Sequence, residues 1–177
     1  GLVNQWYLED LSANVRAALS AKRRQGKYLS AFALYGYRKA AADRNRLVPD
    51  PDAAPVVRRI FALCLAGYGA ARIALVLNAE GVASPSAYKR SRDARYKAPP
   101  HAQWSSAAVL KLLHNPIYTG DMVQGRYQKA GRAKGAAVPQ PRESWTVAAA
   151  THEPLVSRET FALAQRLLAQ RRAQTQP

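Results

Sequence analysis

Residues able to perform covalent or metal-assisted chemistry are few in this sequence, and they are scattered. His101, His114 and His152 have no cysteine or Glu-x-x-His neighbour, so they form no recognised metal-binding pattern. Cys64 is the single cysteine and lies in an apolar run, which predicts a buried structural thiol. No serine lies in a nucleophile-elbow pattern, and no glycine-rich phosphate loop occurs. We therefore expect neither catalysis nor a bound metal or cofactor in this chain.

Lysine and arginine carry the chemistry that the sequence does offer. The 177 residues include 27 Lys and Arg against 11 Asp and Glu, for a net charge of +16. Such an excess repels itself in a compact fold, and a polyanion relieves that repulsion. The composition thus indicates a nucleic-acid partner without choosing between DNA and RNA, and a merely basic surface is the alternative. Neither a long apolar stretch nor a secretion signal is present, so we expect a cytoplasmic protein without a membrane partner.

The basic residues fall into three segments that we predict to contact nucleic acid. The first runs from a helix end into an extended arm and contains Lys22, Arg23, Arg24, Lys27, Tyr28, Arg38 and Lys39. The second interleaves cations with tyrosines and contains Lys89, Arg90, Arg92, Arg95 and Lys97. The third contains Arg126, Lys129, Arg132, Lys134 and Arg142. Phosphate contacts of this kind add affinity and salt dependence but read no sequence.

Apolar periodicity predicts the elements that position these segments. Residues spaced by three and four predict helices over 8–25, 51–67, 70–78, 106–114 and 158–172. Glu9 and Asp10 are expected in the first turn of the first helix, and Gly26 at its end. Asp50 is the expected N-cap of the second. Short strands are expected over 35–40, 46–48, 118–127 and 144–148, with an extended linker at 26–34, a long basic loop at 82–103 and a mobile loop at 129–137.

These elements predict an α+β fold that is mainly helical, with a long N-terminal helix, a small antiparallel sheet and a helix-turn-helix-like core. The core would comprise the helix at 70–78, a turn at Gly81 and the helix that Ser105 caps. In such a unit the second helix enters the major groove, so Ser105, Ser106 and Ala107 would face base edges, with Lys111 and His114 further along. Two amphipathic helices that simply pack together are the alternative.

Several motifs, taken in order along nearly the whole chain, resemble a known family. They include LEDLSANVR at 8–16, GKYLSAFALYGY at 26–37, Trp104-Ser105, LHNPIYTG at 113–120 and THEPLVS at 151–157. Their order and spacing together resemble the recombinase domain of large serine recombinases, the phage-type serine integrases and related transposon resolvases. On this resemblance, residues 1–25 are the C-terminal part of a long helix from a catalytic domain, 26–34 a linker and 35–177 the recombinase domain.

The resemblance implies sequence-specific binding of duplex DNA at recombination attachment sites, during integration or excision of mobile DNA. In this family a serine of an upstream catalytic domain cuts the DNA, and a downstream zinc ribbon supplies the cysteines that are missing here. We therefore expect a monomeric fragment that binds DNA without cleaving it, from a parent that is a dimer or tetramer on DNA. A basic RNA-binding or ribosome-associated protein is the alternative. The target sequence, the host element and the direction of recombination stay open.

Overall fold

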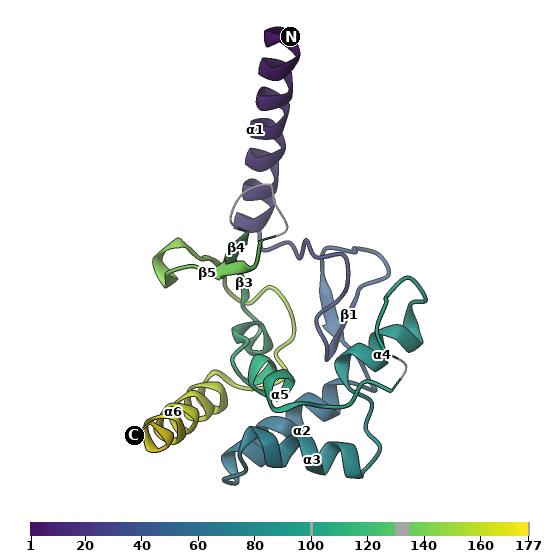
Figure 1. The fold of residues 1–177 in the computed structure, drawn as a ribbon, viewed down its shortest axis with the longest axis vertical. Helices are drawn as coiled ribbons and strands as arrows, with labels where there is room; N and C mark the ends of the chain where they lie inside the picture. Colours follow the sequence, from purple (N-terminus) through teal and green to yellow (C-terminus); the bar gives the residue numbers. More distant parts are fainter. Residues whose placement is uncertain (100, 130–134, 177) are drawn as a thin grey trace. The chain divides into compact units, whose positions relative to one another are not determined.

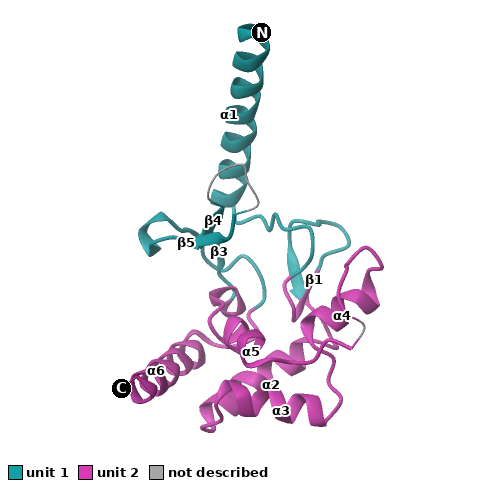
Figure 2. Ribbon diagram, in the orientation of Figure 1, with its two compact units in different colours: residues 1–33, 39–48, 120–153 teal, residues 34–38, 49–119, 154–177 magenta. Residues whose placement is uncertain are grey.

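A computed structural model describes residues 1–99, 101–129 and 135–176 (Figure 1). The chain folds as two compact units (Figure 2). Unit 1 comprises residues 1–33, 39–48 and 120–153, and unit 2 comprises residues 34–38, 49–119 and 154–177. Helices predominate among the described residues and every strand is three residues long, which confirms the mainly helical α+β prediction.

The longest element of unit 1 is helix α1 (Leu2–Arg24). The chain leaves the helix at Gly26, two residues after Arg24, where φ is +74°. The amide of Gly26 donates to the carbonyl of Arg23 (2.9 Å) and that of Lys27 to the carbonyl of Lys22 (3.2 Å). This pair of bonds is a Schellman motif, the ending expected when glycine follows a helix. The predicted C-terminus of this helix is therefore confirmed.

The predicted start of α1 is wrong. The helix begins at Leu2, so Glu9 and Asp10 lie in its middle and its first turn contains no acidic residue. None of its residues is buried, and Leu8, Leu11 and Val15 are 60%, 48% and 51% exposed. The periodicity correctly predicted a helix, but the apolar face that it defined does not pack into a core of this chain.

Two small antiparallel sheets lie wholly within unit 1. Strand β3 (Met122–Gln124) pairs with β6 (Thr146–Ala148), placing Val123 opposite Val147. Strand β4 (Tyr127–Lys129) pairs with β5 (Ala137–Pro139), and a short 3₁₀ helix, η2 (Arg142–Ser144), precedes β6. The strand predicted over 118–127 is thus wrong in its bounds. The loop predicted over 129–137 begins and ends in strands, and its Arg132 and Lys134 lie outside the described residues.

The first hairpin consists of β1 (Tyr37–Lys39) and β2 (Leu47–Pro49), as the sequence predicted. Its polar turn is closed by the carboxylate of Asp43, whose Oδ1 accepts a hydrogen bond from the amide of Asn45 (2.9 Å). An aspartate that bonds the amide two residues on is a common turn-former.

Unit 2 is helical: α2 (Ala54–Leu65), α3 (Ala70–Ala79), α4 (Pro85–Arg92), α5 (Ser106–Leu113) and α6 (Arg158–Thr175), with the 3₁₀ helix η1 (Pro116–Thr119). Helix α2 packs on α6, and α3 on α5. Ser105 and Ser157 cap α5 and α6, as predicted. The core contains Val57, Ile60, Ile73, Leu77, Val109 and Leu113, each with no exposed surface.

Tyr118 lies in the core of unit 2 and is 1% exposed. Its hydroxyl donates to the carbonyl of Tyr35 (2.6 Å), and its own carbonyl accepts from the amides of Leu155 (2.9 Å) and Val156 (3.3 Å). Its ring lies parallel to Tyr37, at 6.0 Å between centroids, and edge-on to Phe61 at 6.2 Å. This one side chain therefore joins the first strand, α2 and the segment that leads into α6.

Two predictions in unit 2 are corrected. Helix α2 begins at Ala54, because residues 51–53 form a turn that the Asp50 carboxylate closes by accepting from the amides of Asp52 and Ala53. The loop predicted over 82–103 contains α4, which Ser84 caps through the amide of Ala87. That helix has polar residues and little apolar periodicity, so only its Ser-Pro start could have indicated it.

Among the described residues no helix is both long and apolar enough to cross a membrane.

Gly36 is the residue at which a side chain would conflict most directly with the core of unit 2. Its φ is +98°, and an added Cβ would lie 2.7 Å from Cγ2 of Val57 and 2.9 Å from Cδ1 of Leu155. Gly36→Ala should lower the free energy of unfolding by roughly 2–4 kcal/mol, because backbone strain and overpacking add. Chemical denaturation of the 177-residue chain measures this loss.

Gly81→Ala is the matched control, since Gly81 also has a positive φ (+70°) but nothing within 4 Å of the added Cβ. It should cost about 1–2 kcal/mol, from strain alone. Equal losses in the two variants would contradict the packing argument.

Candidate nucleic-acid interface

Helix α5 presents one face to the core and another to solvent. Val109, Leu112 and Leu113 are buried, whereas Ser106, Ala107, Leu110 and Lys111 are exposed. The Oγ of Ser105 accepts from the amide of Ala108 (3.1 Å), which fixes where the helix begins. The residues predicted to face base edges are therefore accessible on a helix whose opposite face is anchored.

Asn78 is a positioning residue that the sequence-based site prediction missed. Its Nδ2 donates to the carbonyl of Trp104 (2.9 Å) and its Oδ1 accepts from the amide of Trp104 (2.8 Å). The end of α3 is thus tied directly to the residue before the cap of α5. The two helices form a helix-turn-helix-like pair, although their connection contains α4 and is no tight turn.

All three arginines of the second basic segment have internal partners. Arg92 forms an ion pair with Asp52 (2.5 Å), Arg95 one with Asp93 (2.6 Å), and Arg90 donates to the carbonyl of Ala98. All three guanidiniums are exposed, so each would have to exchange or share its partner in order to bind a phosphate. Lys97 is also exposed, and Lys89 is half-buried.

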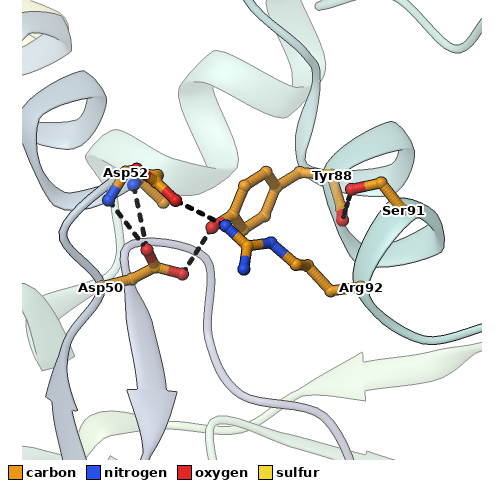
Figure 3. A network of polar contacts seen from close by, with 6 residues as sticks. Asp50, Asp52, Tyr88, Ser91 and Arg92 are labelled. Carbon is orange, nitrogen blue, oxygen red and sulfur yellow. Dashed lines mark hydrogen bonds and ion pairs between the residues drawn. The ribbon is translucent and has the colours of Figure 1, made fainter.

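A polar network ties α4 to the turn before α2 (Figure 3). The Tyr88 hydroxyl donates to Oδ2 of Asp50 (2.7 Å), and Arg92 lies 5.2 Å from the centroid of the Tyr88 ring while pairing with Asp52. Asp50 is 8% exposed. Burial raises the pKa of Asp50, but the hydrogen bonds from Tyr88 and from the amides of Asp52 and Ala53 outweigh it, and the net pKa is lowered. Burial and the Asp50 carboxylate raise the pKa of Tyr88 to about 12.

Tyr88→Phe should lower the free energy of unfolding at pH 7 by roughly 1–3 kcal/mol, since it leaves a buried carboxylate short of one donor. Because the folded pKa of Asp50 is lowered, the stability that it contributes is present above its unfolded pKa and is lost as the pH falls through the folded value. The difference between Tyr88→Phe and the unmodified chain should therefore shrink in acid. Urea denaturation from pH 7 to pH 3 measures it.

Tyr68→Phe serves as the control, because the ring that lies 4.0 Å from the Arg72 guanidinium is kept and no carboxylate is involved. Its effect should be small and independent of pH. A pH-independent loss in Tyr88→Phe would refute the coupling to Asp50.

In unit 1 the basic end of α1 continues into an anchored arm. Lys22, Arg23 and Arg24 are exposed and form the last turn of the helix, and Lys27 is half-buried. The carbonyl of Lys27 accepts from Nε2 of Gln124 (2.8 Å), which holds the arm beside β3. Four cations thus lie close together in the chain on either side of a fixed helix end.

Two other predicted contacts of the first segment lie against each other. Tyr28 is 7% exposed, and its hydroxyl donates to the carbonyl of Phe32 (2.7 Å). The Lys39 ammonium lies 5.8 Å from the Tyr28 ring centroid, and burial followed by the charge of Arg44 lowers the pKa of Lys39. Tyr28 therefore supports Lys39 within unit 1, whereas Arg38 is exposed.

The third basic segment is built around Trp145, which the site prediction did not include. The guanidiniums of Arg126 and Arg142 lie 5.4 Å and 5.7 Å from its ring, and Arg126 also lies 5.7 Å from Tyr127. Burial lowers the pKa of Arg126. Nε1 of Trp145 donates to the carbonyl of Gln140 (2.9 Å), and Lys129 is exposed on β4.

The three histidines and the cysteine each have their own surroundings in the fold. His101 is exposed. Nδ1 of His114 lies 2.8 Å from Oε1 of Gln165, and Nδ1 of His152 lies 2.7 Å from Oγ1 of Thr151. Cys64 is buried, which confirms that prediction, and burial raises the pKa of its thiol. In the part of the chain that the structure describes, no three His, Cys, Asp or Glu side chains gather as a metal site.

Comparison with known proteins identifies the family. The Recombinase family model matches residues 51–171, more than half of the chain. The chain therefore belongs to the Recombinase family, which confirms the resemblance seen in its motifs. A curated relative, the uncharacterized protein YefB of Bacillus subtilis (strain 168), is 30% identical over 93 residues, covering 52% of this chain and 29% of YefB.

The fold is similar to part of a solved large serine recombinase (LSR). A crystal structure of an LSR–DNA complex matches with a TM-score of 0.52 and 15% identity, covering 89% of this chain and 38% of that chain. A structure from work on the sequence requirements of the Listeria innocua prophage attP site matches with a TM-score of 0.45 and 16% identity, covering 86% and 50%. This chain thus spans at most half the length of each of these three proteins.

The basic end of α1 leads to a test of phosphate contact. Arg24→Gln and Lys27→Gln should each weaken binding to duplex DNA of any sequence. Each should also reduce the slope of log K against log salt by roughly 0.9, the value for one lost phosphate contact. Fluorescence anisotropy between about 50 and 200 mM salt measures the slope.

Arg16→Gln removes the same charge from the exposed middle of α1, where the side chain bonds only the carbonyl of Ser12 among the partners described. Its slope should match that of the unmodified chain. If the slopes of all three variants equalled that of the unmodified chain, Arg24 and Lys27 would be excluded as phosphate contacts.

Proposed function

We propose that this chain is the DNA-binding part of a serine site-specific recombinase and binds duplex DNA at a recombination attachment site. The observation that carries the proposal is the exposed first turn of α5. The opposite face of this helix is buried through Val109, Leu112 and Leu113. Membership of the Recombinase family and the likeness of the fold to a DNA-bound LSR support it.

The geometry of α5 suits the major groove. That groove is about 12 Å wide and admits one helix, whose N-terminal residues then face the base edges. Ser106 and Lys111 extend from the exposed side of α5 and offer a hydroxyl and an ammonium to acceptors on bases or phosphates. A serine hydroxyl bonds several base edges, so Ser106 alone would discriminate weakly between sequences.

Affinity in this proposal comes mainly from phosphate contacts. The cations at the end of α1 and Lys97 are exposed and pair with no carboxylate among the ion pairs described, whereas Arg92 and Arg95 already neutralise Asp52 and Asp93. We assign the strand cleavage of the parent recombinase to residues outside this chain, and we expect the isolated chain to bind as a monomer. A dimer or tetramer on DNA would be a property of the parent.

Selection from a random duplex library tests the function. The 177-residue chain should enrich one family of sites, and it should bind the selected duplex more tightly than a shuffled duplex or a single-stranded RNA of equal length. Ser106→Ala should reduce the ratio of selected to shuffled affinity by roughly 3–10-fold and change the affinity for shuffled DNA little, because a base contact is lost and a phosphate contact is not.

Ser157→Ala removes an exposed serine hydroxyl at the start of α6, where it caps that helix, and should leave the ratio unchanged. If RNA bound as tightly as the selected duplex, the chain would be a general basic RNA-binding protein. Equal losses on selected and shuffled DNA in Ser106→Ala would contradict the placement of α5 in the groove.

A further inference from the structure

Unit 2 contains a cavity of about 310 Å³ between α4 and α5. A single water needs only about 10–15 Å³ of such space, so the cavity can admit a larger polar group. Its wall includes the side chains of Lys89 from α4 and Lys111 from α5. None of the described residues that line it is acidic. Two ammonium-bearing side chains therefore share one hollow whose described wall supplies no carboxylate.

Lys89 is held in the cavity rather than extended into solvent. The side chain is half-buried, and its ammonium lies 5.6 Å from the centroid of the Tyr96 ring, which also lines the cavity. Burial lowers the pKa of Lys89, the Coulombic interaction with Tyr96 raises it, and the positive charge of Lys111 lowers it again. The charged form of Lys89 is thus disfavoured by its surroundings, and an anion in the cavity would offset that cost.

The backbone adds to the positive potential. Ser86 in the first turn of α4 and Ser105 at the N-cap of α5 both line the cavity. The N-terminal ends of these two eight-residue helices carry partial positive charge and amides without intrahelical partners. Their effect reinforces the two lysines, which are the feature that distinguishes this hollow from an ordinary helix end.

We propose that this cavity is a phosphate-binding site in which Lys89 and Lys111 together hold one phosphate group. Lysine binds phosphate as a point charge, so two lysines from different helices can contact separate oxygens of one tetrahedral group. If the phosphate group held by the two lysines belongs to the backbone of bound duplex DNA, the inference rests on the proposed function. A phosphate ion in solution is the other source of the same chemistry. A backbone phosphate fixed here would set the position of DNA relative to the exposed turn of α5.

The first arm of the test uses inorganic phosphate and no DNA. The full chain, labelled with ¹³C-lysine, is titrated with sodium phosphate and separately with sodium chloride at matched ionic strength. Two lysine ε-CH₂ signals should shift with saturation in phosphate alone, and Lys89→Met and Lys111→Met should identify them. Equal responses to phosphate and chloride would overturn a specific site for free phosphate.

The second arm measures duplex affinity by anisotropy. Lys89→Met and Lys111→Met should each weaken binding about tenfold, the size expected when one charge-assisted contact is lost. Arg166→Met removes the same charge from the exposed surface of α6 and should change affinity less than about twofold. Lys89→Arg keeps the charge and should retain most of the affinity, which separates loss of the contact from loss of the fold.

The two arms together separate the sources. Tenfold losses in the lysine variants assign the site to a backbone phosphate, whereas losses no larger than that of Arg166→Met, with saturable phosphate shifts, assign it to a phosphate ion. If neither arm responds, the proposal is overturned while duplex binding by the unmodified chain still supports the proposed function. If the unmodified chain fails to bind duplex, the proposed function is lost, and the phosphate titration alone decides the cavity.

Discussion

The burial of Tyr118 is the constraint on which unit 2 depends. A phenol can be placed in a core only if its hydroxyl finds a partner, and the carbonyl of Tyr35 supplies one. That requirement fixes the chain just before β1 against the segment after α5. It also explains the glycine at position 36, where a Cβ would lie 3.3 Å from the Tyr118 ring. The buried face of α5 packs into this core, and Ser105 caps the N-terminus of the helix. Together they fix the position of the exposed face.

Much of this architecture could be predicted from residue patterns. The ends marked by strong local chemistry, at Gly26, Ser105 and Ser157, are where the sequence predicted them, because a cap or a left-handed glycine acts within one helical turn. The Ser84 cap of α4 is a signal of the same kind, but no apolar periodicity follows it, so this segment was predicted as a loop. Helix α4 is polar, so its hold on the fold comes from Tyr88 and Arg92 reaching residues about 40 positions earlier in the chain. No local pattern reveals a contact at that separation.

The candidate interface was predictable in composition but not in detail. A count of charges treats all cations alike, whereas in the folded chain some cations have internal partners and others are exposed. Arg92 and Arg95 are matched with aspartates, Lys39 faces Tyr28, and Arg126 is held between aromatic rings. Lys89 and Lys111 lie 22 positions apart in the sequence and meet only because α4 and α5 line one cavity. The sequence could name both lysines as contacts, but it could not show that they share a ligand.

The bridge between Asn78 and Trp104 has a consequence for how such a domain can change over evolution. Two hydrogen bonds join the end of α3 to the residue before the cap of α5, so the placement of α5 does not rely on the 25 residues that separate them. Insertions, deletions and substitutions in that stretch can accumulate while the helix stays in place. Apart from Ser84 and Tyr88, which hold α4 in place, the connection is therefore free to diversify, and relatives can acquire new contacts there without rebuilding the scaffold.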